Sequence, residues 1–103
     1  MKIPKSLKKS ASKKIWTEIT EAWEIDESGM VLLMTALEAY ERYLEAKEIL
    51  DKHGFVYKTS SGQLKKNPAL EVEKVARGQF LIAWRMLNLG IDPPGNIGRP
   101  GGS

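Results

Sequence analysis

Several features that support catalysis or secretion are missing from this sequence of 103 residues. Cysteine is absent, which excludes disulfides, thiolate metal sites and a cysteine nucleophile, and favours a reducing, intracellular setting. The one histidine, His53, is expected in the last turn of a helix, where a cation complements the helix dipole. It has no second histidine or cysteine with which to hold a metal, and no glycine-rich phosphate-binding motif occurs. We therefore expect no enzymatic activity, no cofactor and no metal site.

Long apolar runs are also absent. The longest has five residues, as in Met30 to Met34, whereas a transmembrane helix needs about 20. The basic N-terminus is not followed by the apolar segment of a secretory signal. We therefore expect no membrane contact. The apolar share of 42% and the charged share of 28% are those of an ordinary globular domain with a core.

A modest net charge of +3 conceals a strong segregation of charge along the chain. Residues 1–14 carry six lysines and no acid, whereas residues 15–54 carry ten acids against three basic side chains. Residues 55–90 are basic again, with six basic residues and two acids. Such segregation indicates a polyanion partner or self-association between unlike surfaces, although a lysine-rich terminus can also be merely solvated.

Apolar residues at helical spacing predict three helices, at residues 12–23, from 26 or 28 to 53, and at 67–89. Ser10 or Ser12 can cap the first and Asp26 or Ser28 the second, and Asn67-Pro68 is a strong helix start. The second helix would be about 40 Å long, which exceeds the roughly 33 Å width of a compact chain of this size. We therefore expect an elongated molecule, or one completed by neighbouring subunits.

A β-hairpin is predicted between the second and third helices. Residues 55–59 and 63–66 have strand character, and Ser60-Ser61-Gly62 supplies the turn. Because a lone hairpin is marginal in water, we expect Phe55, Tyr57 or Leu64 to rest on the helices.

The predicted fold is therefore mainly α. It has three helices, a long central helix packed antiparallel to a C-terminal helix, and one short β-hairpin between helices 2 and 3. The predicted division is a flexible basic arm at residues 1–14, a helical core at 15–90 with the hairpin at about 55–66, and a flexible Gly/Pro tail at 91–103.

Lysines are the best candidates for a functional site, because lysine binds phosphates as a point charge with little base specificity. We expect the arm to carry most DNA binding and the hairpin to be secondary. The candidate DNA-binding residues are Lys5, Lys8, Lys9, Lys13, Lys14, Lys58, Lys65 and Lys66. In the tail, Gly98-Arg99-Pro100 has the core of an AT-hook, but a plain linker is the favoured interpretation.

The third helix is apolar nearly all round between Phe80 and Leu87, where only Arg85 is polar. A helix of so small a domain cannot hide every side internally, so we expect a homo-oligomer interface, unless the first helix covers the surplus. The candidate interface residues are Phe80, Leu81, Ile82, Trp84 and Met86. Trp16, Trp23 and Trp84 lie on apolar stripes and are expected to be structural.

The order of motifs resembles the small subunit of a tailed-phage terminase over about three quarters of the chain. The most specific parts are the blocks Thr59-Ser60-Ser61-Gly62-Gln63-Leu64-Lys65-Lys66-Asn67-Pro68-Ala69 and Leu87-Asn88-Leu89-Gly90-Ile91-Asp92-Pro93. Other resembling pieces are Ile15-Trp16 with Trp23, Ile25-Asp26-Glu27-Ser28-Gly29, Ala39-Tyr40-Glu41-Arg42-Tyr43 with Ala46, Gly54, and Phe80. After Asp92 the chain has only a short glycine-proline tail.

The resemblance implies a non-catalytic DNA-recognition and regulatory component of a viral genome-packaging motor. Such a protein would form an oligomer in the form of a ring, bind double-stranded viral DNA and work with the large ATPase–nuclease subunit in the cytoplasm of the bacterial host. The alternative is a helical protein-interaction adaptor without specific DNA binding, and a third possibility is a small RNA-binding accessory protein.

Overall fold

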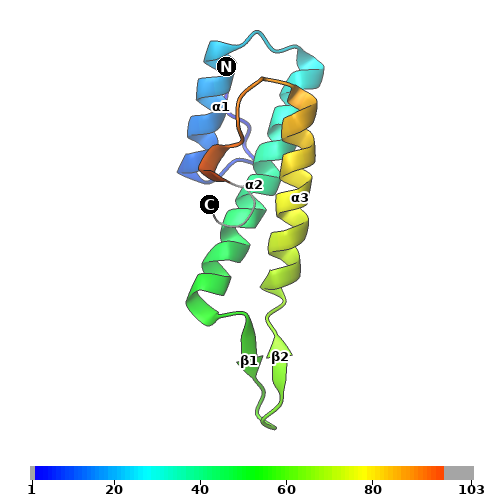
Figure 1. Cartoon of the computed structure of the whole chain (residues 1–103). Coiled ribbons are helices and arrows are strands. Elements are labelled where there is room, and N and C mark those ends of the chain that lie inside the picture. Colours follow the sequence, from blue (N-terminus) through cyan, green and yellow to red (C-terminus); the bar gives the residue numbers. More distant parts are fainter. Residues whose placement is uncertain (1, 97–103) are drawn as a thin grey trace.

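The computed structural model describes residues 2–96, and three helices with one hairpin make up most of them (Figure 1). The elements are α1 (Ser10–Ala22), α2 (Glu27–His53), β1 (Val56–Lys58), β2 (Leu64–Lys66) and α3 (Ala69–Leu87), followed by one 3-10 turn at Pro94–Asn96. α2 and α3 run antiparallel side by side, and the molecule measures 56 × 30 × 19 Å. The predicted three-helix fold, the hairpin and the elongated shape are confirmed.

The core lies where α1 meets the α2–α3 pair. Leu33 and Leu37 of α2 and Phe80 of α3 are completely buried, at the helical spacings that predicted the apolar stripes. The Phe80 ring lies between those of Tyr40 and Trp84, with centroid distances of 5.2 and 5.6 Å. α1 contributes Trp16 and Ile19 to this cluster. A second, smaller cluster of Ala46, Leu50 and Ala69 joins α2 and α3 toward the hairpin.

The turn from α1 into α2 follows its sequence signals. The Asp26 carboxylate accepts a hydrogen bond of 2.8 Å from the Gly29 N–H, so Asp26 is the N-cap of α2. Gly29 is required for packing, because a Cβ there would lie 2.4 Å from Cγ2 of Ile25. The side chain of Ile25 therefore packs on the first turn of α2, at the point where the chain turns from α1 into α2.

The start of α1 differs from the prediction. The helix begins at Ser10, two residues earlier than expected, and neither Ser10 nor Ser12 caps it; Lys9 is the cap residue and makes no side-chain cap hydrogen bond. Ser12 is instead fully buried against the core. Glu41 of α2 accepts hydrogen bonds from the Lys8 and Lys9 N–H groups just before the helix, which fixes the chain where it enters α1.

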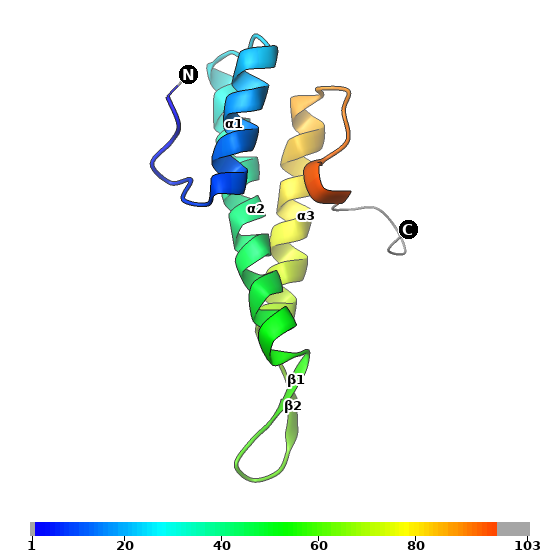
Figure 2. The same ribbon diagram turned by 90° about the vertical axis from the view of Figure 1, so that its left-hand side faces the viewer.

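The hairpin projects beyond the ends of α2 and α3 (Figures 1 and 2). The expectation that Phe55, Tyr57 or Leu64 would rest on the helices is wrong, since these side chains are 65%, 44% and 69% exposed. The strands are also shorter than predicted, with three residues each. The cause lies at the base of the hairpin, where backbone hydrogen bonds direct both strands away from the helices.

One asparagine holds that base. The Asn67 N–H donates to the Phe55 carbonyl (2.7 Å), and its side-chain amide donates to the Gly54 carbonyl (2.9 Å). Its Oδ1 accepts from the Ala69 N–H (3.0 Å), and Pro68 between them already has helical φ and ψ, so Asn67 caps this first turn as predicted. Gly54 ends α2 with φ of 81°, a conformation that favours glycine. The hairpin is thus clamped to the end of one helix and the start of the other.

α3 ends at Leu87 because Asn88 adopts the left-handed conformation with φ of 53°, before the expected stop at Gly90. The chain then folds back along α3, and the Trp84 indole N–H donates to the Ile91 carbonyl at 3.2 Å. The remaining part of the predicted tail at 97–103, with Gly98-Arg99-Pro100, lies outside the described residues.

Candidate nucleic-acid interface

The predicted basic arm is in large part packed against the helices. Residues 10–14 form the first turn of α1, which places Lys13 and Lys14 on that helix and corrects the predicted boundary of the arm. Leu7 is only 2% exposed, because it belongs to the core cluster. Lys5, Lys8 and Lys9 lie on the segment that leads into α1, alongside the helices (Figure 2).

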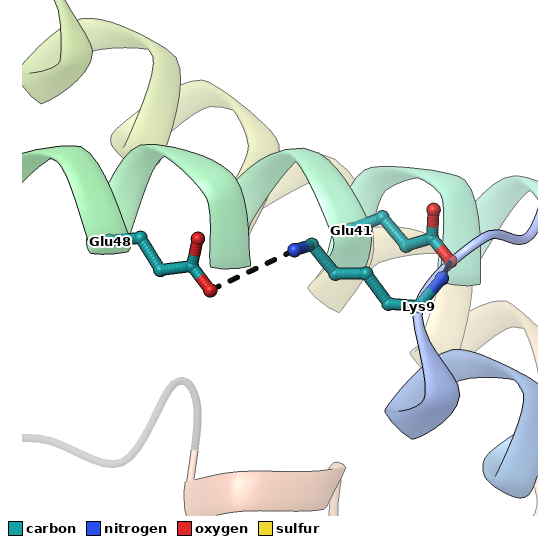
Figure 3. A network of polar contacts seen from close by, with 3 residues as sticks. All are labelled: Lys9, Glu41 and Glu48. Atoms are coloured by element: carbon teal, nitrogen blue, oxygen red, sulfur yellow. Dashed lines mark hydrogen bonds and ion pairs between the residues drawn. The ribbon is translucent and has the colours of Figure 1, made fainter.

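Glu41 of α2 fixes this segment. One carboxylate oxygen accepts hydrogen bonds from both the Lys8 and the Lys9 N–H, each at 2.8 Å, and the residue is 7% exposed. Figure 3 shows Glu41 beside the Lys9 backbone. The negative charge at the start of α1 also complements the helix dipole. No sequence signal predicts this role of Glu41, because the segment that buries it lies 32 positions away along the chain.

Acidic side chains accompany the N-terminal lysines. The Lys9 ammonium lies 3.8 Å from Glu48 (Figure 3), and that of Lys14 lies 4.0 Å from Glu18. Exposed pairs of this kind contribute little stability, but they lower the positive potential that a polyanion would meet. The lysines that dominate the sequence are therefore partly compensated in the folded chain.

The hairpin lysines have different surroundings. Lys66 pairs with Val56, Lys65 with Tyr57, and Lys58 with Leu64 across the antiparallel strands. Since successive residues of a strand point to opposite faces, Lys65 lies on one face of the hairpin while Lys58 and Lys66 lie on the other. All three are exposed, and no ion pair involves them within residues 2–96. The chain has no acid between Asp51 and Glu71, so this end is uniformly cationic.

The opposite end of the molecule is acidic. Glu18, Glu21, Glu24, Asp26 and Glu27 surround the α1–α2 turn, and no lysine or arginine occurs between Lys14 and Arg42. Figure 1 shows this turn and the hairpin at opposite ends of the elongated molecule. The folded chain is therefore a rod with a cationic hairpin pole and an anionic turn pole.

The five predicted interface residues separate into two groups. Phe80 and Trp84 are 0% and 5% exposed and belong to the chain's own core, so the structure corrects these two positions: α1 and α2 cover them. Leu81 is half-buried, while Ile82 and Met86 are 59% and 63% exposed. The core cluster, to which α1 and α2 both contribute, therefore covers one side of α3. Ile82 and Met86 stay exposed on another side, and an oligomer interface there remains a prediction.

The bare side continues along α3 as a stripe, here called the α3 stripe, formed by Val72, Val75, Gln79, Ile82 and Met86. Its spacing of alternately three and four residues is that of a coiled-coil seam. Val72 and Val75, about half exposed, line a pocket of about 400 Å³ with Arg42 of α2. The Arg42 guanidinium donates to the Gln79 amide oxygen at 3.0 Å. The sequence carries this spacing, but the predicted interface was confined to the Phe80–Leu87 segment and did not include Val72 and Val75.

No helix in the described part of the chain is long and apolar enough to cross a bilayer. Within the same residues, no three histidine, cysteine or carboxylate side chains gather into a metal-binding group.

Comparison with protein-family models gives a match over residues 9–91 to a family described as phage terminase, small subunit. The match covers α1, α2, the hairpin and α3. No curated protein and no solved structure matches the chain.

Proposed function

The chain belongs to the phage terminase small-subunit family, and from that premise we propose that it is a non-catalytic DNA-recognition and regulatory component of a viral genome-packaging motor. It binds double-stranded viral DNA and assembles into a homo-oligomer, in the form of a ring. It works with the terminase large subunit, which supplies the ATPase and nuclease activities, in the cytoplasm of the bacterial host.

The observation that carries DNA binding is the cationic hairpin pole, together with the family match. Lys58, Lys65 and Lys66 stand on an element that projects from the molecule with no carboxylate near it in sequence. The N-terminal lysines add charge along the side of the rod. A surface of this kind is attracted to phosphate backbones through counterion release, which makes its affinity strongly dependent on salt.

The α3 stripe supports self-association. Large apolar side chains at coiled-coil spacing on one face of α3 would bury their surface against a second copy of the same rod. α2 contributes Val31 and Ile49, which are 57% and 45% exposed, as further apolar contacts outside the core. The family match makes a second copy the first partner to consider for this face.

The proposed function is tested by two measurements on the full chain. Light scattering gives the absolute mass of the assembly. This mass should correspond to well over two chains of 11.5 kDa each. Fluorescence anisotropy with a labelled 30-base-pair duplex at about 50 mM and 200 mM salt should show binding that falls by at least tenfold. An equal-length double-stranded RNA is the control, since preference for it would indicate the RNA-binding alternative.

A helical adaptor is the second candidate, and the exposed apolar side chains of the hairpin are the observation that favours it. An adaptor would bind neither nucleic acid at about 50 mM salt, even as an oligomer. That outcome would overturn the packaging proposal for this chain.

A further inference from the structure

The hairpin combines a cationic stem with an uncharged polar loop, and this combination has a specific use. We propose that the hairpin enters the major groove of duplex DNA loop first, with the stem lysines on the phosphates and the loop residues 59–63 against base edges. The inference rests on the proposed DNA-binding function and assigns the contact to one element of the chain.

Charge favours the hairpin over the N-terminal segment as the leading contact. Lys9 and Lys14 have carboxylates of this chain within 4.0 Å, and Glu41 lies beneath the same segment. Between residues 52 and 70, by contrast, the chain carries Lys52, Lys58, Lys65 and Lys66 and no acid. The hairpin also lies at the pole farthest from the acidic α1–α2 turn (Figure 1), so DNA there avoids the carboxylates.

The placement of the lysines suits a groove more than a flat surface. Lys65 is on one face of the ribbon, and Lys58 and Lys66 are on the other. A ribbon that enters a groove end-on has a phosphate backbone on each side, so lysines on both faces each find a partner. The major groove, about 12 Å wide, admits a two-stranded ribbon. The core of a protein–protein interface, by contrast, is depleted in lysine, and neither face of this ribbon is free of it.

The loop is ordered by its own hydrogen bonds. The Thr59 N–H donates to the Gln63 carbonyl (2.8 Å), the Gly62 N–H donates to the Thr59 carbonyl (2.9 Å), and the Thr59 hydroxyl contacts the Ser61 hydroxyl (3.0 Å). The exposed side chains of Ser60 and Gln63 take no part in these bonds. They remain available to base edges, and a Gln amide can bind adenine N6 and N7 in the major groove at once.

The hydrogen bonds at the base of the hairpin hold its loop in place before DNA binds. Asn67 ties Gly54, Phe55 and Ala69 together, so the ribbon is held at a fixed angle to two helices. A ribbon fixed in advance loses little conformational freedom on binding, which favours a specific contact over a loose electrostatic one.

The first experiment compares two charge-matched triple variants of the full chain. One carries Lys58→Gln, Lys65→Gln and Lys66→Gln; the other carries Lys2→Gln, Lys5→Gln and Lys8→Gln. Both remove the same charge from exposed positions, and circular dichroism and light scattering check that fold and mass are kept. On a 30-base-pair duplex, the hairpin variant should lower the slope of log affinity against log salt by about 2.7 per hairpin engaged, at about 0.9 for each phosphate contact. The N-terminal variant should change the slope by less than about one.

The second experiment tests groove and readout. Dimethyl sulfate should be blocked by the wild type at guanine N7, which lies in the major groove, and not at adenine N3, which lies in the minor groove. Gln63→Ala should keep the slope of log affinity against log salt. In selection from a randomised DNA pool, its preference for one base at the position that Gln63 contacts should fall by roughly five- to 150-fold. Gln63→Glu should abolish binding by repelling the phosphates.

The outcomes separate the two proposals. If the wild type binds DNA and only the N-terminal variant lowers the slope of log affinity against log salt, that result overturns the hairpin assignment and leaves the proposed function standing. Protection at adenine N3 alone overturns major-groove entry. Wild-type chain that binds no duplex at about 50 mM salt overturns the proposed function itself. If the hairpin variant binds DNA normally but loses a protein partner, the ribbon is a protein-docking element.

Discussion

Removal of the Glu41 carboxylate should loosen the N-terminal segment from the helices. In Glu41→Ala the Lys8 and Lys9 amides both lose their acceptor, which lies 2.8 Å from each. A hydrogen bond to a charged group contributes about 1.5–3 kcal/mol, and the two share one oxygen, so we expect a loss of about 2–4 kcal/mol in unfolding free energy. For a domain of this size that lowers Tm by at least about 10 °C.

Amide hydrogen exchange at Lys8 and Lys9, together with urea denaturation, measures this effect. Both amides should be protected in the wild type and exchange rapidly in Glu41→Ala, while Glu41→Gln, which keeps an uncharged acceptor, should lie between them. Glu45→Ala is the matched control, because Glu45 is exposed on the same helix and should change stability by no more than about 0.5 kcal/mol. Equal protection of the Lys8 and Lys9 amides in wild type and Glu41→Ala would refute the reasoning.

Three further predictions concern the α3 stripe, the core and high pH. Ile82→Glu should shift the mass measured by light scattering toward the monomer without loss of helicity. Arg85→Glu, which lies on the same helix but off the stripe, should leave the mass unchanged. A wild type that is monomeric at high micromolar concentration contradicts self-association through the stripe. Trp84→Ala should cost about 3–5 kcal/mol and unfold the chain by circular dichroism; a folded variant that fails to bind DNA would make Trp84 a recognition residue. Burial, with a contribution from Tyr43, raises the pKa of Tyr40 above its ordinary 10.0. The folded chain therefore holds that proton more tightly than the unfolded chain does, so stability should be level below about pH 10 and fall above it, and Tyr40→Phe should reduce that fall in pH-dependent denaturation.

The elements that depend on local signals were predictable from the sequence. Apolar spacing located all three helices, and Asp26 and Asn67 cap α2 and α3 as their residue types suggest. The second helix ends at residue 53 as predicted, where Gly54 adopts a positive φ that favours glycine. Each of these features is determined by residues within one turn of the position concerned, which is why the sequence carries them.

The features that depend on distant contacts were not predictable. α1 begins directly after the Lys8 and Lys9 amides that Glu41 of α2 binds, and this contact joins positions more than 30 residues apart, so the local serines gave the wrong start. Periodicity identified the apolar sides of α3 but could not tell which side α2 and the rest of the core would cover, and hence could not separate Phe80 from Ile82. The hairpin residues likewise have strand propensity whether or not they rest on a helix.

Under the proposed function, the opposite charges at the two ends of the rod would couple DNA binding to assembly. If copies lie side by side and parallel, their hairpin poles come together and repel one another, as do their acidic turns. Phosphates at the hairpin poles remove the first of these repulsions, so DNA should strengthen the association of subunits. By thermodynamic reciprocity, an assembled oligomer should bind DNA more tightly by the same factor. Added salt then acts in two directions, since it weakens the contact with DNA while it screens the repulsion between neighbours.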